Sequence, residues 1–191
     1  MKTGRLEAFS DGVIAIIITI MVLELKVPEE ADFAGLEPLI PKFMSYILSF
    51  IYVGIYWNNH HHLFHVIERV NGKILWANMG LLFAMSLIPL TTAWMGEHHF
   101  DRNPTTLYGC NLLLCAIAFF ILEYAAIKSE GKASKLGKAL HNTTKENLSW
   151  ILYLAGIVCS FYQPLISVIC YFSVAVIWLV PDTRIEKQMK E

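Results

Sequence analysis

Six runs of mostly apolar residues fill most of the chain, and each is close to the length that a membrane-crossing helix needs. The hydrocarbon core of a bilayer is about 30 Å thick, so a spanning helix needs roughly 17–25 predominantly apolar residues. The six runs cover residues 6–27, 41–63, 74–95, 105–127, 148–162 and 164–180. We therefore predict an all-α membrane protein in which residues 1–191 form one domain of six transmembrane helices.

The composition also indicates a membrane protein. Of the 191 residues, 55% are apolar and 16% are charged, whereas soluble domains carry about 45–50% apolar and about 25% charged residues. The formal net charge of −1 excludes a strongly basic surface of the kind that binds nucleic acid. We expect lipids rather than nucleic acid around this chain.

The fifth and sixth runs are short and meet at Gln163-Pro164. Proline disfavours a helical conformation at the residue before it, so the sequence predicts a tight hairpin between two spans and not one long helix. Pro181 is expected to end the sixth span, because proline lacks the backbone N–H that would continue a helix.

Basic residues gather on alternate connections between the runs. Of the 15 Lys and Arg residues, only Lys26, Lys42 and Arg102 fall on one side of the predicted topology, and the other twelve fall on the opposite side. Connections rich in Lys and Arg stay in the cytoplasm, so we predict a multi-pass protein of the cell membrane with both termini cytoplasmic. Glu7 and Asp11 interrupt the first run, which argues against a cleaved signal peptide.

No enzyme signature is present in the sequence. The chain has no Walker, GxGxxG, HExxH or GxSxG motif, each of which would mark a specific chemistry. The four cysteines, Cys110, Cys115, Cys159 and Cys170, lie in apolar runs without CxxC spacing and are expected to be packing residues. We predict that the protein is not an enzyme and holds no cofactor and no metal.

The start of the first run places ionisable groups where lipid disfavours them. Arg5 and Asp11 flank the sequence Leu-Glu-Ala-Phe-Ser, and such groups at a span are stable only when they pair, face water or contact other helices. We expect partners for them on neighbouring helices, although both would also be stable at the membrane interface itself.

One stripe of the first helix has two interpretations. At 100° per residue, Arg5, Gly12, Ile16, Thr19 and Leu23 fall within about 40° of one another, and Ile20 lies about 60° from Leu23. Such a stripe is suited to ordinary helix packing through Gly12. It is equally suited to the wall of a pore, where apolar rings gate a water path by dewetting.

Short motifs in the first three runs resemble the transmembrane protein 175 family of endosomal and lysosomal potassium channels. Arg5 and the Phe9-Ser10-Asp11 triplet match the signature of its first helix. The second run resembles the family through Ser49-Phe50 and residues 57–64, and the third through Asn78 and residues 86–89. The last three runs match by length and placement, including Pro181 and Arg184.

The resemblance implies a six-helix subunit, equivalent to one repeat of the two-repeat animal channel, that assembles as a homotetramer with the first helix lining a central pore. It implies a potassium channel with modest preference over sodium and K⁺ as the permeant ion. A hydrophobic constriction at Ile16, with deeper layers at Thr19, Ile20 and Leu23, would replace the carbonyl filter of other potassium channels. It also implies a structural hydrogen-bond network of Arg5, Phe9, Ser10, Asp11, Ser49, Trp57, His60 and His61.

Two other functions stay open from the sequence alone. One is a proton-coupled or metal secondary transporter, in which the cluster from His60 to His65 binds a metal or intramembrane acids such as Glu24 and Glu123 couple protons. His61 and His65 are four residues apart, the spacing of two ligands on one helix face. The other is a structural membrane subunit that transports nothing.

Overall fold

The computed structural model describes residues 3–28, 31–131 and 144–179. In these ranges the chain is helical and contains no β-strand, which confirms the prediction of an all-α protein. Its elements are α1 (Thr3–Leu23), η1 (Phe33–Leu39), α2 (Ile40–Val66), α3 (Gly72–Ser86), α4 (Ile88–Glu97), α5 (Arg102–Glu130), α7 (Thr144–Cys159) and α8 (Pro164–Leu179).

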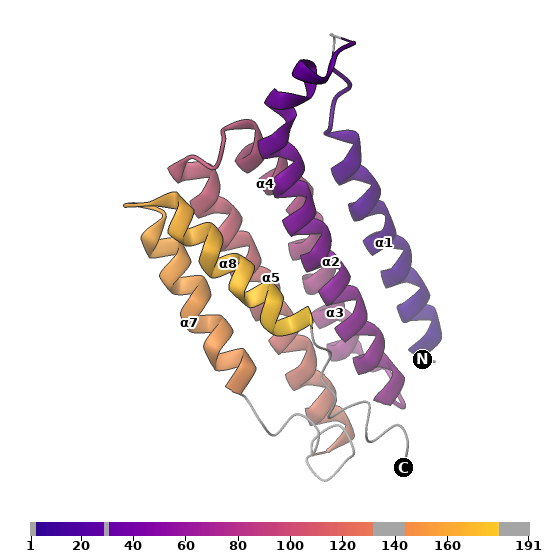
Figure 1. The fold of residues 1–191 in the computed structure, drawn as a ribbon. Coiled ribbons are helices and arrows are strands. Elements are labelled where there is room, and N and C mark those ends of the chain that lie inside the picture. The colour runs from indigo at the N-terminus through magenta and orange to yellow at the C-terminus, as the bar shows by residue number, and fades with distance from the viewer. Residues whose placement is uncertain (1–2, 29–30, 132–143, 180–191) are drawn as a thin grey trace.

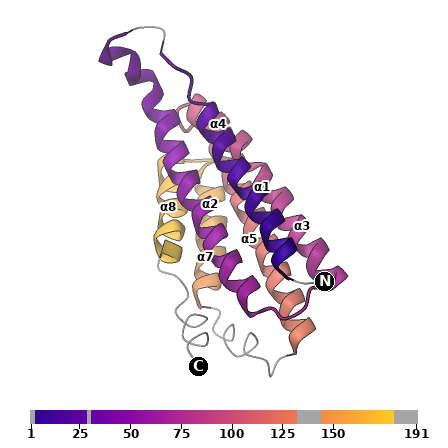
Figure 2. The ribbon, with the colours of Figure 1, turned by 90° about the vertical axis from the view of Figure 1, so that its right-hand side faces the viewer.

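The helices form one elongated bundle (Figure 1). α1 lies at one side and packs against α2, α3 and α4, while the hairpin of α7 and α8 lies at the other side and packs against α5 and α2. The Thr3 end of α1 and the Leu179 end of α8 point toward the same end of the bundle (Figure 2). A chain that runs along the bundle an even number of times has both ends at the same end of it.

Helices occupy all six of the predicted spans. Four stretches are long and apolar enough to cross a membrane, namely Thr3–Leu23, Phe33–Val66, Gly72–Glu97 and Arg102–Glu130. α7 and α8 have 16 residues each, which at about 1.5 Å per residue is about 24 Å, less than the hydrocarbon core. The predicted end of the sixth span at residue 180, and Pro181 after it, lie outside the described residues.

The third predicted span is two helices and not one. α3 begins at an Asn71 cap, whose side-chain oxygen accepts bonds from the N–H groups of Lys73 and Ile74. It ends before Leu87, and α4 continues from Ile88 with Pro89 in its first turn. Pro89 lacks the N–H that an unbroken helix would donate to the carbonyl four residues earlier, so the hydrogen-bond ladder is interrupted here.

The hairpin expected at Gln163-Pro164 is present. The Gln163 N–H donates to the Cys159 carbonyl at 2.8 Å, and Pro164 begins α8, a position where its missing N–H leaves no helix bond unmade. Two glycines, one on α5 and one on α7, leave room for a tyrosine of the hairpin. A Cβ added at Gly109 on α5 or at Gly156 on α7 would collide with the buried ring of Tyr171 on α8.

Candidate functional site

The predicted stripe of α1 faces away from the rest of the subunit. The side chains of Ile16, Ile20 and Leu23 are 58%, 42% and 77% exposed, and Thr19 is also exposed. The Thr19 hydroxyl donates to the Ile16 carbonyl at 2.9 Å. Gly12 lies on the same face with no atom within 4 Å of an added Cβ, so Gly12 is not a point of close helix packing inside the subunit.

The opposite face of α1 is buried. Leu6, Ser10, Ile14, Ile17 and Met21 recur at intervals of three or four residues and pack into the bundle. An amphipathic helix has this spacing, but here the exposed face is as apolar as the buried one. The helix therefore has one face that the subunit covers and one apolar face that it leaves open.

Three buried polar side chains connect α1, α3 and α2. The Asn78 amide nitrogen donates to the Ser10 hydroxyl at 2.9 Å, and the Asn78 amide oxygen lies 2.8 Å from Nε2 of His60. Because that oxygen only accepts, Nε2 of His60 carries the proton. Ser10 in turn donates to the Leu6 carbonyl at 2.9 Å, so the chain of donors runs in one direction from α2 to the α1 backbone.

Two further contacts, both exposed, join α1 to α2. The Trp57 indole N–H donates to the Asp11 carboxylate at 3.0 Å, and Nδ1 of His61 lies 2.9 Å from the Glu7 carboxylate. The Trp57 and His61 rings stack at 6.2 Å. Asp11 thus has the partner on a neighbouring helix that the sequence predicts, and the first three turns of α1 are fixed by polar contacts.

Three residues of the predicted network take no part in the hydrogen bonds that join α1, α2 and α3 in the described residues. Ser49 bonds to Thr92 at 2.7 Å and to Tyr108 at 2.9 Å, because it lies eight residues before Trp57, which is about 12 Å along a helix. The Phe9 side chain is 51% exposed. Arg5 is exposed and makes no hydrogen bond or ion pair with the described residues.

Two residues of the network were not among the predicted site residues. Asn78 is part of the third-run motif, but its position between Ser10 and His60 depends on how α3 is aligned with α1 and α2, which a single sequence does not show. Glu7 lies four residues before Asp11, on the same face of α1. This spacing could have indicated that both carboxylates contact α2.

The residues named in the transporter hypothesis do not form a common metal or proton site among the described residues of this subunit. Across the described ranges, no group of three His, Cys, Asp or Glu residues is placed to hold a metal ion. His61 contacts Glu7, and the rings of His61 and His65 are 6.2 Å apart. Glu24 follows the end of α1, whereas Glu123 lies in the last third of the antiparallel α5, so the two acids are near opposite ends of the bundle.

Comparison with known proteins agrees on one family. The sequence model for the endosomal/lysosomal potassium channel TMEM175 matches residues 5–89. A protein of Chryseobacterium sp. strain P1-3 named a potassium channel is 59% identical over 191 residues, covering 100% of both chains. A mouse protein named an endosomal/lysosomal proton channel is 34% identical over 142 residues, covering 65% of this chain and 28% of the mouse protein.

A solved structure has the same fold. It is the crystal structure of a lysosomal potassium-selective channel TMEM175 homolog from Chamaesiphon minutus, with a TM-score of 0.81 and 30% sequence identity. The match covers 94% of this chain and 97% of that chain. The likeness therefore includes the last three spans, for which the sequence motifs offered little.

Proposed function

Because this chain belongs to the TMEM175 family, we propose that it is a potassium-selective cation channel whose pore is lined by α1 of four identical subunits. The family resemblance carried by Arg5 and the Phe9-Ser10-Asp11 triplet is confirmed by these matches. The Chryseobacterium relative is named a potassium channel and the Chamaesiphon homolog a potassium-selective channel, which supports the same ion for this protein.

The observation that carries the proposal is the open apolar face of α1. Ile16 is 58% exposed in the subunit although it lies in the middle of a membrane-length helix. In a tetramer with α1 at the axis, four Ile16 side chains form a ring, and an apolar ring of small radius gates by dewetting. Thr19, Ile20 and Leu23 form the layers toward the far mouth.

Selectivity in this proposal comes from partial dehydration at the apolar ring. The sequence has no TVGYG segment to supply a carbonyl filter. K⁺ holds its hydration shell less tightly than Na⁺, so passage through the Ile16 ring favours K⁺ modestly. Glu24 is exposed directly after α1, and four copies would raise the local concentration of cations at that mouth.

The proposal also includes a membrane orientation. The excess of Lys and Arg lies on the side of both chain ends, so the positive-inside rule places the Thr3 end of α1 and the Leu179 end of α8 toward the cytoplasm of the cell membrane. The Glu24 mouth then faces outward.

Ion flux from liposomes tests the proposal. Purified wild-type protein is expected to release K⁺ faster than Na⁺ under equal gradients. Replacement Ile16→Asn is expected to raise the flux and to reduce the K⁺ preference, because a polar ring holds water in the constriction. The matched control is Ile151→Asn, since Ile151 is 63% exposed on α7, away from α1.

The two variants separate the outcomes. A change in Ile16→Asn that is absent from Ile151→Asn supports the pore position. Equal behaviour of both variants would place the pathway elsewhere, and a stable oligomer without flux of either ion would overturn the channel proposal.

A further inference from the structure

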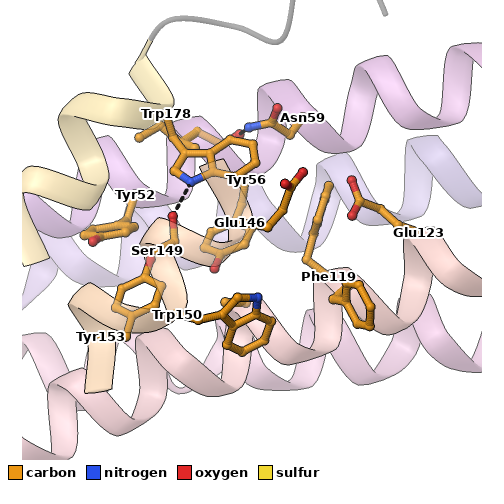
Figure 3. Close-up of a pocket in the computed structure, with 13 residues that line it drawn as sticks. Tyr52, Tyr56, Asn59, Phe119, Glu123, Glu146, Ser149, Trp150, Tyr153 and Trp178 are labelled. Atoms are coloured by element: carbon orange, nitrogen blue, oxygen red, sulfur yellow. Dashed lines mark hydrogen bonds between the residues drawn. The ribbon is translucent and has the colours of Figure 1, made fainter. Parts of the chain in front are cut away.

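A pocket away from α1 lies among α2, α5, α7 and α8 (Figure 3). It is near the end of the bundle at which α5 ends and α7 begins. The space between its side chains is about 590 Å³ with its open mouth included. Nothing in the pore proposal uses this pocket.

Aromatic side chains form most of its walls. The rings of Tyr56 and Phe119 are 6.0 Å apart, and those of Phe120 and Trp150 are 6.3 Å apart and nearly perpendicular. The Trp178 indole N–H donates to Ser149 at 2.8 Å, which fixes the orientation of that ring (Figure 3). Aromatic faces carry partial negative charge and attract cations.

Two carboxylates line the same pocket. Glu123 comes from α5 and Glu146 from the first turn of α7. Figure 3 shows both on the same side of the space, beside the Phe119 ring. Both side chains are only partly exposed. Carboxylates that line a pocket attract the positive charge of an ammonium group placed beside them.

An ammonium group already lies over one of these rings. Nζ of Lys145 is 5.8 Å from the centroid of the Trp178 ring, within the range of a cation–π contact. The Trp178 ring therefore already takes part in one cation–π contact.

We propose that this pocket binds the ammonium head of a small organic cation, with aromatic faces around the head and the carboxylates of Glu123 and Glu146 beside it. Aromatic cages bind quaternary ammonium ions in this way. The pocket is crowded by its rings, so it takes a compact head, and any longer body extends through the mouth.

Choline and its neutral analogue test the proposal. The two molecules 3,3-dimethyl-1-butanol and choline have the same shape and differ in charge. Equilibrium dialysis of labelled choline against the detergent-purified protein is expected to show saturable binding, with the neutral analogue on the order of tenfold weaker or more. Equal binding of the two molecules, or no binding of choline, would overturn the proposal.

Isosteric variants locate the site. Glu146→Gln and Glu123→Gln are each expected to weaken choline binding on the order of tenfold. Glu68→Gln is the control, since Glu68 is exposed beyond the end of α2. Each variant is first checked for the wild-type elution volume. If one fails this check the other decides, and wild-type affinity in a folded variant would overturn the assignment.

Two sources could supply such a head, a soluble amine or an ammonium lipid. Protein is reconstituted with phosphatidylethanolamine or with phosphatidylglycerol alone and then delipidated. Phosphatidylethanolamine retained by the wild type and lost by Glu146→Gln would identify a lipid headgroup as the ligand. Choline binding without retained lipid would identify a soluble amine, and both results support the same ammonium site.

Discussion

At the scale of single residues, Asn78 connects three helices although it was not among the predicted site residues. Its amide satisfies Ser10 on α1 and His60 on α2 at once, and all three side chains are buried. An apolar side chain here would leave a buried N–H of His60 without an acceptor. A buried polar group without its partner costs more than the bond itself contributes.

We predict that Asn78→Leu lowers the free energy of unfolding by on the order of 1–3 kcal/mol. Thermal unfolding in detergent, followed by tryptophan fluorescence, measures the effect. Ser86→Ala is the control, because the Ser86 hydroxyl bonds only to the carbonyl of Phe83 in its own helix and is exposed. A variant as stable as Ser86→Ala would show that the buried bridge does not hold α1.

Sequence reasoning at this scale succeeded where a motif named both partners. Asp11 and Trp57 were expected together and are hydrogen-bonded at 3.0 Å. Ser49 was placed in the same network and lies in another, with Thr92 and Tyr108. A motif shows which residues occur together but not how far apart they lie along the helix. The rise per residue gives that distance, and it separates Ser49 from Trp57.

At the scale of elements, periodicity identified the two faces of α1 but not the break between α3 and α4. The stripe from Ile16 to Leu23 is open because the alternate stripe, from Leu6 to Met21, packs on neighbours. Hydropathy runs unbroken through Pro89, and a proline within a membrane span is compatible with a helix that continues. Apolar content therefore gave the length of the third span, and Pro89 in its second half was the sequence signal for its division.

The close packing around Tyr171 on α8 provides a test with matched glycines on α5 and α7. Gly109→Ala and Gly156→Ala are each expected to destabilise the protein by roughly 1–3 kcal/mol, because the new methyl group collides with Tyr171. Gly54→Ala and Gly80→Ala have open space at the same position and are expected to be neutral or stabilising by up to about 1 kcal/mol.

Melting temperatures of the four variants in one detergent give the comparison. Equal shifts in both pairs would mean that Tyr171 moves aside without loss, and that this close fit does not hold α8 against α5 and α7.

At the scale of the whole molecule, the subunit leaves one apolar face of α1 uncovered. α1 is a membrane-length helix of which 28% is buried in its most apolar window, and its open stripe contains Gly12 and Thr19. Small residues let helices of different subunits approach closely in a membrane. A second, third and fourth copy around this face would give it protein and water as neighbours in place of lipid.

Native mass spectrometry of the detergent-solubilised protein is expected to give a mass of four chains, each of 21.7 kDa. Gly12→Leu is expected to shift the population toward smaller species, since Gly12 has open space within its own subunit and in the proposed tetramer the larger side chain would crowd the other copies of α1. Gly80→Leu on α3 serves as the comparison. A wild-type protein that stays monomeric at all concentrations would contradict the four-copy pore.

The Thr19 hydroxyl has a consequence for the sign of the ion that a pore on α1 admits. Its only hydrogen is engaged by the Ile16 carbonyl of the same helix, so the oxygen presents lone pairs and no proton to the open side. A dehydrating cation would find an acceptor at this layer, whereas chloride would find nothing that donates. One side-chain torsion would then discriminate between cations and anions without a formal charge in the membrane.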